Sequence, residues 1–192
     1  MQRLPLFLLH TVLFPGQRLP LKVFEARYLD MVSDCLKREQ PFGVCLIKSG
    51  REVGAAGEPH SVGTLAHIEQ WEMPKPGVLH ILVRGGECFQ IHSTEKHGEL
   101  VIAEVELREL ELALEVPARY ASLVEFLQEV HRDHEPPPDA DYTNASWVGW
   151  RLAELLLVGN DIRQRWLAQR DPIMRLGEIR EELEKLADEH PD

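Results

Sequence analysis

The sequence predicts an α+β protein, in which a small mixed β-barrel of residues 1–115 with one helix is followed by an α-helical bundle of residues 116–192. Three observations predict this class. Apolar residues alternate with period two through most of the first part, as they do in half-buried strands. A single helical pattern interrupts that part. After Pro117 the apolar spacing becomes helical.

The chain is expected to open with two short strands inside residues 4–28. Pro5, Pro15 and Pro20 lie there among apolar residues. Proline fixes φ and removes a backbone donor, so such strands are expected at sheet edges or bends. Pro15 precedes Gly16, a pair typical of a turn, because proline presets the first corner and glycine accepts a positive φ at the next.

One helix is predicted at roughly residues 26–37, where an apolar stripe has helical spacing that can close one end of a curled sheet. The stripe consists of Tyr28, Val32, Cys35 and Leu36. Two later segments alternate as strands. Leu79, Ile81 and Val83 are expected to share one face of the first strand, and Val101, Ala103, Val105 and Leu107 to share one face of the second.

The second part is predicted to form four helices. They are expected at residues 117–134, at 145–157, from a cap at Asn160 or Asp161 to Gln169, and at 172–189. Asp171 directly precedes Pro172, which places a capping residue before proline at the first helical position. The proline-rich residues 135–141 cannot continue a helix and are expected to form an exposed, stiff linker.

Composition and charge exclude several classes of protein. The 192 residues are 44% hydrophobic and 28% charged, which is unlike a disordered chain. No apolar run approaches the ~18 residues that a membrane helix needs. Residues 1–115 carry 12 basic and 16 acidic side chains, and residues 116–192 carry 9 and 16, giving −11 overall. Neither part has the cation excess that phosphate backbones require, so no nucleic-acid partner is expected.

The three cysteines Cys35, Cys45 and Cys88 each lie in an apolar pattern. An odd, widely spaced set of this kind is expected to be reduced and inert in the core of a cytoplasmic protein.

Catalytic and metal-binding patterns are weak. His131 and His134 are three residues apart, so a helix would bring them near one face where a metal could bridge them. The order of an H-E-x-x-H motif is missing, and a solvated helix end is the favoured interpretation. The sequence has no G-x-x-x-x-G-K-[ST] phosphate loop. No residue is assigned a catalytic, cofactor-binding or metal-binding role.

Features that could bind a polypeptide are better supported. Residues 70–77 are predicted to be a loop that presents Trp71 and Met73, a pair suited to gripping apolar segments of many different chains. Alternatively, Trp71 ends a strand and packs on the barrel. Trp147 and Trp150 share one helix face, where Trp150 is expected in the core and Trp147 is either a core residue or a binding residue.

The segment LPLFLLHTVLFPGQRLPLKVFEARY, residues 4–28, resembles the opening of the Lon protease N-terminal domain, the substrate-recognition domain of that family. The resemblance continues through residues 42–47, 52–54, 62–68, 79–91, 103–105 and 150–156, and through Asp171-Pro172 with Arg175-Leu176. Glu87, Cys88 and Gln90 stand where family members carry basic residues, so no role for those cations is carried over. The matched Glu25 and Arg27 are expected to orient the strand-to-helix junction.

The resemblance implies a PUA-like barrel and a helical subdomain that together form one Lon N-terminal-like domain. It implies non-catalytic recognition of unfolded or degron-bearing polypeptides, or service as an adaptor for an AAA+ protease. Without a phosphate loop, and with the chain ending at Asp192, a stand-alone member without ATPase or peptidase modules is expected. Two alternatives remain: a small, hydrolase-like enzyme with an unrecognised pocket, and a PUA-like RNA-binding module, which the acidic charge disfavours.

Overall fold

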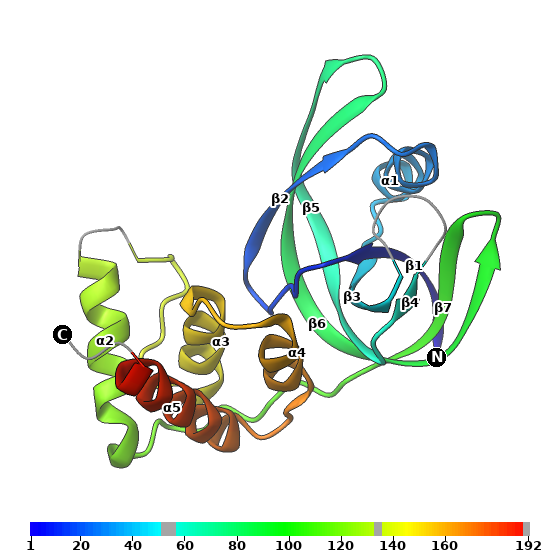
Figure 1. Cartoon of the computed structure of the whole chain (residues 1–192). Helices are drawn as coiled ribbons and strands as arrows, with labels where there is room; N and C mark the ends of the chain where they lie inside the picture. The colour runs from blue at the N-terminus through cyan, green and yellow to red at the C-terminus, as the bar shows by residue number, and fades with distance from the viewer. Residues whose placement is uncertain (51–56, 133–135, 190–192) are drawn as a thin grey trace. The chain divides into compact units, whose positions relative to one another are not determined.

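The computed structural model describes residues 1–50, 57–132 and 136–189 (Figure 1). The chain divides into two compact units, Met1–Glu109 and Leu110–Asp192. Within the described residues, the first unit holds seven strands and one α-helix, and the second holds a 3₁₀ turn and four α-helices. The predicted α+β class is therefore confirmed. A boundary after residue 115 stays a prediction, and the turn expected at residues 52–54 lies outside the described residues.

The strands of the first unit close on themselves. They are β1 (Gln2–Leu9), β2 (Arg18–Val23), β3 (Phe42–Ser49), β4 (Glu58–Pro59), β5 (Val62–Lys75), β6 (Val78–His97) and β7 (Leu100–Leu107). Their order is β1-β7-β6-β5-β3-β4, with β2 paired to β6. Because β1 pairs antiparallel with β7 and parallel with β3, the strands β1, β7, β6, β5 and β3 form a closed ring.

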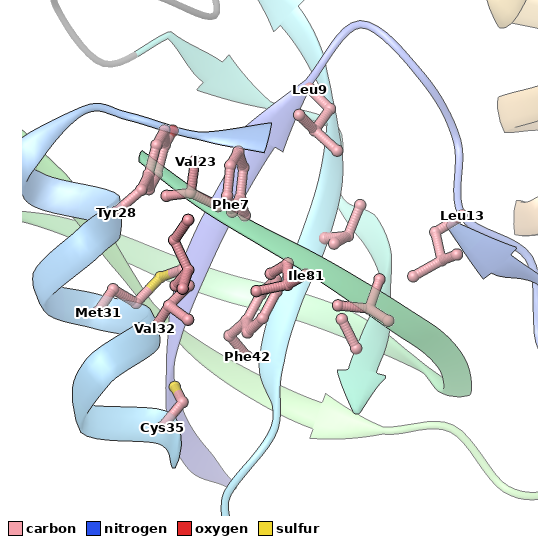
Figure 2. Close-up of a cluster of buried hydrophobic side chains, with 14 residues drawn as sticks. Phe7, Leu9, Leu13, Val23, Tyr28, Met31, Val32, Cys35, Phe42 and Ile81 are labelled. Atoms are coloured by element: carbon pink, nitrogen blue, oxygen red, sulfur yellow. The ribbon is translucent and has the colours of Figure 1, made fainter. Parts of the chain in front are cut away.

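Helix α1 (Ala26–Arg38) packs on the first of two apolar clusters, as Figure 2 shows. Tyr28 stacks on Phe7 of β1 with ring centroids 4.0 Å apart. The predicted stripe is confirmed, with Tyr28, Val32 and Cys35 buried and Leu36 half-buried. Residues 79, 81 and 83 are buried on one face of β6, as the alternation predicts.

The second apolar cluster lies among β1, β3, β5, β6 and β7. Its members are Leu4, Leu6, Leu8, Cys45, Ile47, Leu65, Phe89, Val101, Ala103 and Val105. Leu107, which follows the alternation of these last three residues, is 41% exposed because it is the last residue of β7. Cys88 is half-buried rather than a core residue, since it alternates along β6 with the fully buried Phe89.

The predicted turn at Pro15-Gly16 is confirmed and is fastened to β6. Gly16 has a φ of 77°, a conformation that glycine adopts without steric cost. Its amide donates to the Gly85 carbonyl at 2.7 Å, and the Gly85 amide donates to the Gln17 carbonyl at 2.8 Å. A Cβ on Gly85 would lie 2.1 Å from the Phe14 carbonyl oxygen, so only glycine allows this approach.

The four predicted helices of the second unit are confirmed. They are α2 (Ala121–Arg132), preceded by the 3₁₀ turn Ala118–Tyr120, α3 (Ala145–Leu155), α4 (Asn160–Ala168) and α5 (Pro172–Glu189). Asp171 caps α5 as predicted, because its Oδ1 accepts from the amides of Ile173 and Met174. The predicted cap of α4 is wrong: Gly159 holds the N-cap position, and its carbonyl accepts the first helical hydrogen bonds.

A buried cation organises the second unit. Arg175 is fully buried and donates to both carboxylate oxygens of Glu111, to the Trp166 carbonyl at 3.2 Å and to the Gln169 carbonyl at 2.7 Å. Its guanidinium lies 3.3 Å from the ring centroid of Trp150. A charge this deeply buried is tolerated only when it is paired and hydrogen-bonded, so these partners depend on one another.

Replacing Gly85 by alanine is expected to lower the free energy of unfolding by about 3 kcal/mol, because the new methyl group meets the Phe14 backbone, which cannot move aside alone. Gly86→Ala is the matched control. Its Cβ meets the ring of the exposed His67, which can rotate away, so a cost below about 1 kcal/mol is expected. Urea denaturation measures both variants, and equal losses would contradict the close approach at residue 85.

The substitution Arg175→Met is expected to destabilise the protein by about 3–5 kcal/mol, because it removes the cation paired with the Glu111 carboxylate and the donor to two carbonyls. Arg180 is the control. It lies on the same helix, 39% of its side chain is exposed, and it pairs with Glu184 at 3.5 Å. Arg180→Met should change stability by less than about 1 kcal/mol. Thermal unfolding distinguishes the two, and a mild effect at residue 175 would refute its structural role.

Candidate functional site

The longest strands of the first unit extend into a hairpin, here called the hairpin arm and defined as residues 70–82 (Figure 1), in which residues 79–82 of β6 also pair with β2. The loop predicted at residues 70–77 is wrong, because β5 continues to Lys75 and pairs with β6 through Gln70↔Leu82, Trp71↔Ile81 and Glu72↔His80. Proline is tolerated on a strand where its missing amide would not face a partner, so Pro74 does not end the strand. The alternation of residues 70–73 is the signal that could have predicted it.

The hairpin arm exposes the two candidate binding residues. Trp71 is 60% and Met73 is 58% exposed. Trp71 pairs with Ile81, which fixes the face of its side chain, whereas Met73 lies between Glu72 and Lys75, where the pairing with β6 is irregular. The alternative in which Trp71 packs on the sheet is therefore wrong. Large apolar side chains gathered on a projecting element are typical of interaction sites.

The face of the sheet that carries Trp71 is the same face that carries the apolar core residues of β6 and β2. Residues paired across antiparallel strands lie on the same face, and Trp71 pairs with Ile81, which in turn pairs with Leu21 of β2. Ile81 is buried and Leu21 is partly buried against the cluster under α1. Trp71 is thus the exposed outer end of a row of apolar side chains that runs across three strands.

Acidic side chains flank Trp71. Arg18 of β2 donates to the Glu69 carboxylate at 2.7 Å, which joins the two strands on either side of β6. Glu72 lies 3.2 Å from the Nδ1 of His80, and 73% of its side chain is exposed. Glu69 is thus engaged by an arginine, whereas Glu72 presents its carboxylate to solvent next to Trp71.

Trp147, the third candidate, belongs to the second unit and has its own aromatic neighbours there. Its ring lies edge-on to Tyr142 at 5.2 Å and to His131 at 6.2 Å, and the Nδ1 of His131 is 2.8 Å from the Tyr142 hydroxyl. Trp147 is half-buried, whereas Trp150 is in the core as predicted.

His131 was considered as a metal ligand together with His134, but His134 lies outside the described residues. Among residues 1–50, 57–132 and 136–189, no three His, Cys, Asp or Glu side chains gather in a way that could hold a metal ion.

The Glu25–Arg27 pair orients the start of α1, as expected from the sequence. The two side chains form an ion pair at 3.0 Å, and Arg27 also donates to the Glu99 carbonyl at 2.9 Å. The Arg27 guanidinium lies 4.5 Å from the Tyr28 ring centroid. These contacts engage Arg27 within the first unit and fix the direction in which the helix leaves β2.

The polar groups nearest to an enzyme-like arrangement are solvated. A hollow of about 450 Å³ is lined by residues that include Ser49, Glu58 and Lys96. The Ser49 hydroxyl donates to the Glu58 carboxylate at 3.2 Å, and both side chains are exposed. A carboxylate in water is a weak base, so this contact does not activate the hydroxyl as a nucleophile.

The buried thiols are also unreactive. Burial raises the pKa of Cys35 to about 11 and raises the pKa of Cys45 further. Both groups therefore stay protonated near neutral pH, and a protonated thiol is a poor nucleophile.

Within the described part of the chain, no helix combines the length and the apolar character needed to cross a bilayer.

Comparisons with known proteins agree with this fold. The family model described as "ATP-dependent protease La (LON) substrate-binding domain" matches residues 3–185. The crystal structure of a Lon N-terminal domain protein from Xanthomonas campestris is 36% identical, with a TM-score of 0.81 over 93% of this chain and 97% of that one. The N-terminal domain of the Mycobacterium avium complex Lon protease shares the fold, with 19% identity and a TM-score of 0.69 over 93% of this chain and 96% of that one.

The match to a full-length protease covers only a short stretch of that protein. The Lon protease of Paraburkholderia phytofirmans is 32% identical over 92 residues, which are 45% of this chain and 11% of that protein. The chain thus matches only a small part of that protease's length. Because the family model spans nearly all of the chain, the chain belongs to the Lon substrate-binding domain family.

Proposed function

We propose that the chain is a non-catalytic module that recognises unfolded or degron-bearing polypeptides and links them to ATP-dependent proteolysis, as a substrate-binding part or as an adaptor of an AAA+ protease. Membership of a substrate-binding family supports the general role. The observation that carries the proposal is the exposure of Trp71 and Met73 on the hairpin arm. Trp147, half-buried in the second unit, is proposed as a further contact.

The exposed area on the hairpin arm suits weak, sequence-tolerant binding. Burying the exposed 60% of Trp71 would contribute roughly 2–4 kcal/mol, at ~25 cal/mol per Å² and 150–250 Å² for a whole tryptophan. Association costs several kcal/mol in lost freedom. A contact of this size therefore requires additional apolar or backbone contacts for stable binding, and it favours clients that expose several apolar residues. Unfolded chains meet that condition and folded ones do not.

The structure offers a matched pair of methionines for a direct test. Met73 of β5 and Met174 of α5 are each 58% exposed. The probe is a reduced and carboxamidomethylated protein that cannot refold, and its binding is measured by fluorescence anisotropy. Trp71→Ala is expected to weaken binding roughly tenfold and Met73→Ala about threefold, because exposed anchors contribute about 1 kcal/mol or more. Met174→Ala should bind as the wild type does.

Stability serves as the control on these variants. Trp71→Ala should leave the free energy of unfolding within about 0.5 kcal/mol of the wild type, because the side chain is mostly solvated. If Trp71→Ala and Met73→Ala both bind the unfolded protein as tightly as the wild type does, the hairpin arm is not the binding site. A wild-type protein that binds no unfolded polypeptide at all would contradict the proposed function itself.

A further inference from the structure

The hairpin arm carries a strand edge as well as exposed side chains. Along one edge, β5 pairs with β6 from Val62 to Lys75. Along the other edge it pairs with β3 only at residues 64–66. Among the described residues, no strand pairs with that second edge beyond Ala66. The backbone groups of β5 that point away from β6 in the hairpin arm are therefore open to another extended chain.

This edge is short and has defined ends. The register between β5 and β6 shifts between Ile68 and Gln70, and again between Glu72 and Lys75. Bulges of this kind interrupt strand pairing, and Pro74 has no amide to donate. Residues 70–73 lie between the first shift and Pro74, with Met73 at the start of the second irregular stretch, and they span roughly 13 Å at ~3.3 Å per residue. The edge is thus long enough to pair with about four residues of a partner.

We propose that a client polypeptide binds by adding a strand to β5 at residues 70–73, and that the preferred client segment alternates apolar and basic residues. This inference rests on the proposed polypeptide-recognition function and specifies how the client is held. Backbone hydrogen bonds to the edge tolerate many sequences, while the side chains on the two faces of β5 select among them.

The two faces of the hairpin arm define the preferred alternation. On one face, the row Leu21, Ile81, Trp71 is apolar from β2 to β5. A strand added beyond β5 would extend this row with its own apolar residue. On the other face, the row Lys22, His80, Glu72 ends in an exposed carboxylate. A cation on the added strand would lie beside Glu72, and opposite charges on neighbouring strands stabilise the pairing.

Charge favours a basic client over a second copy of this chain. The formal net charge of −11 attracts a cationic segment at long range. Pairing two copies at the same edge would instead bring together two chains that each carry this charge. Net charge of this magnitude keeps copies of a protein apart, so the observations favour an extended segment of a different polypeptide.

The test uses three peptides on the full chain. The first is acetyl-Val-Lys-Val-Lys-Val-Lys-Val-amide, the second is the same peptide with every internal amide N-methylated, and the third has glutamate in place of lysine. Binding is measured by fluorescence anisotropy of a labelled peptide. The N-methylated peptide is expected to bind at least roughly tenfold more weakly than the parent peptide. It has lost the amide donors that pair with the edge, and its methyl groups block close approach.

The variant Glu72→Lys tests the polar face of the added strand. It should shift the ratio of the affinities for the lysine and glutamate peptides by roughly fivefold to tenfold towards glutamate, because it reverses the charge beside the added strand. The matched control is Glu104→Lys on β7, an exposed carboxylate whose strand pairs with β1 and β6 rather than with the arm's open edge. It should leave that ratio nearly unchanged.

Three outcomes would overturn the inference. Equal binding of the parent and N-methylated peptides, with both losing affinity in Trp71→Ala, rejects strand addition while polypeptide recognition by the hairpin arm stands. Absence of binding by every peptide and by the unfolded protein rejects the proposed function itself. Sedimentation of the wild type as a dimer that Trp71→Ala dissociates would assign the edge to a second copy.

Discussion

The double pairing of β1 is the constraint on which the rest of the first unit depends. Its residues 2–6 pair with β7 along one edge and its residues 6–9 pair with β3 along the other, and this closes the ring and encloses two apolar clusters. Closure satisfies strand edges within the ring. An open edge therefore arises where a strand outgrows the ring. The 14 residues of β5 and the 20 of β6 do so, and their outer parts form the hairpin arm.

The hairpin arm has one end packed in the core and the other end exposed at the proposed binding site. Its inner end carries Ile81, which lies with the neighbouring Val83 of β6 in the core under α1, so the base of the arm is held by the packing of the fold itself. Its outer end carries Trp71 in line with that core but without a cover. A client would complete an apolar row that the fold has begun, with little reorganisation. Pre-organisation of this kind lowers the entropic cost of binding.

Local signals predicted most of the fold, and long-range contacts account for what they missed. The stripe of α1, the Pro15-Gly16 turn and the Asp171-Pro172 cap were visible because each is encoded within a few residues. The sequence favours a loop at residues 70–77, because Pro74 and Pro76 outweigh the alternation of the preceding residues. The Glu111–Arg175 pair joins residues 64 apart in the chain, and no local pattern indicates such a contact. The sequence offers Trp71 and Met73 as candidate binding residues, with a packed Trp71 as the alternative, and the structure exposes both side chains. The open edge beside them depends on where β3 stops pairing.

Amide hydrogen exchange, read residue by residue, shows whether the open edge of β5 receives the client. In the free protein, the outward-facing amides among residues 70–73 should exchange rapidly, while the β6 amides that pair within the ring stay protected. Addition of an unfolded client should slow exchange at these outward-facing amides and leave most of the ring unchanged. Protection that instead appears only in the second unit, or client binding with no change in exchange at the β5 amides, would contradict strand addition at this edge.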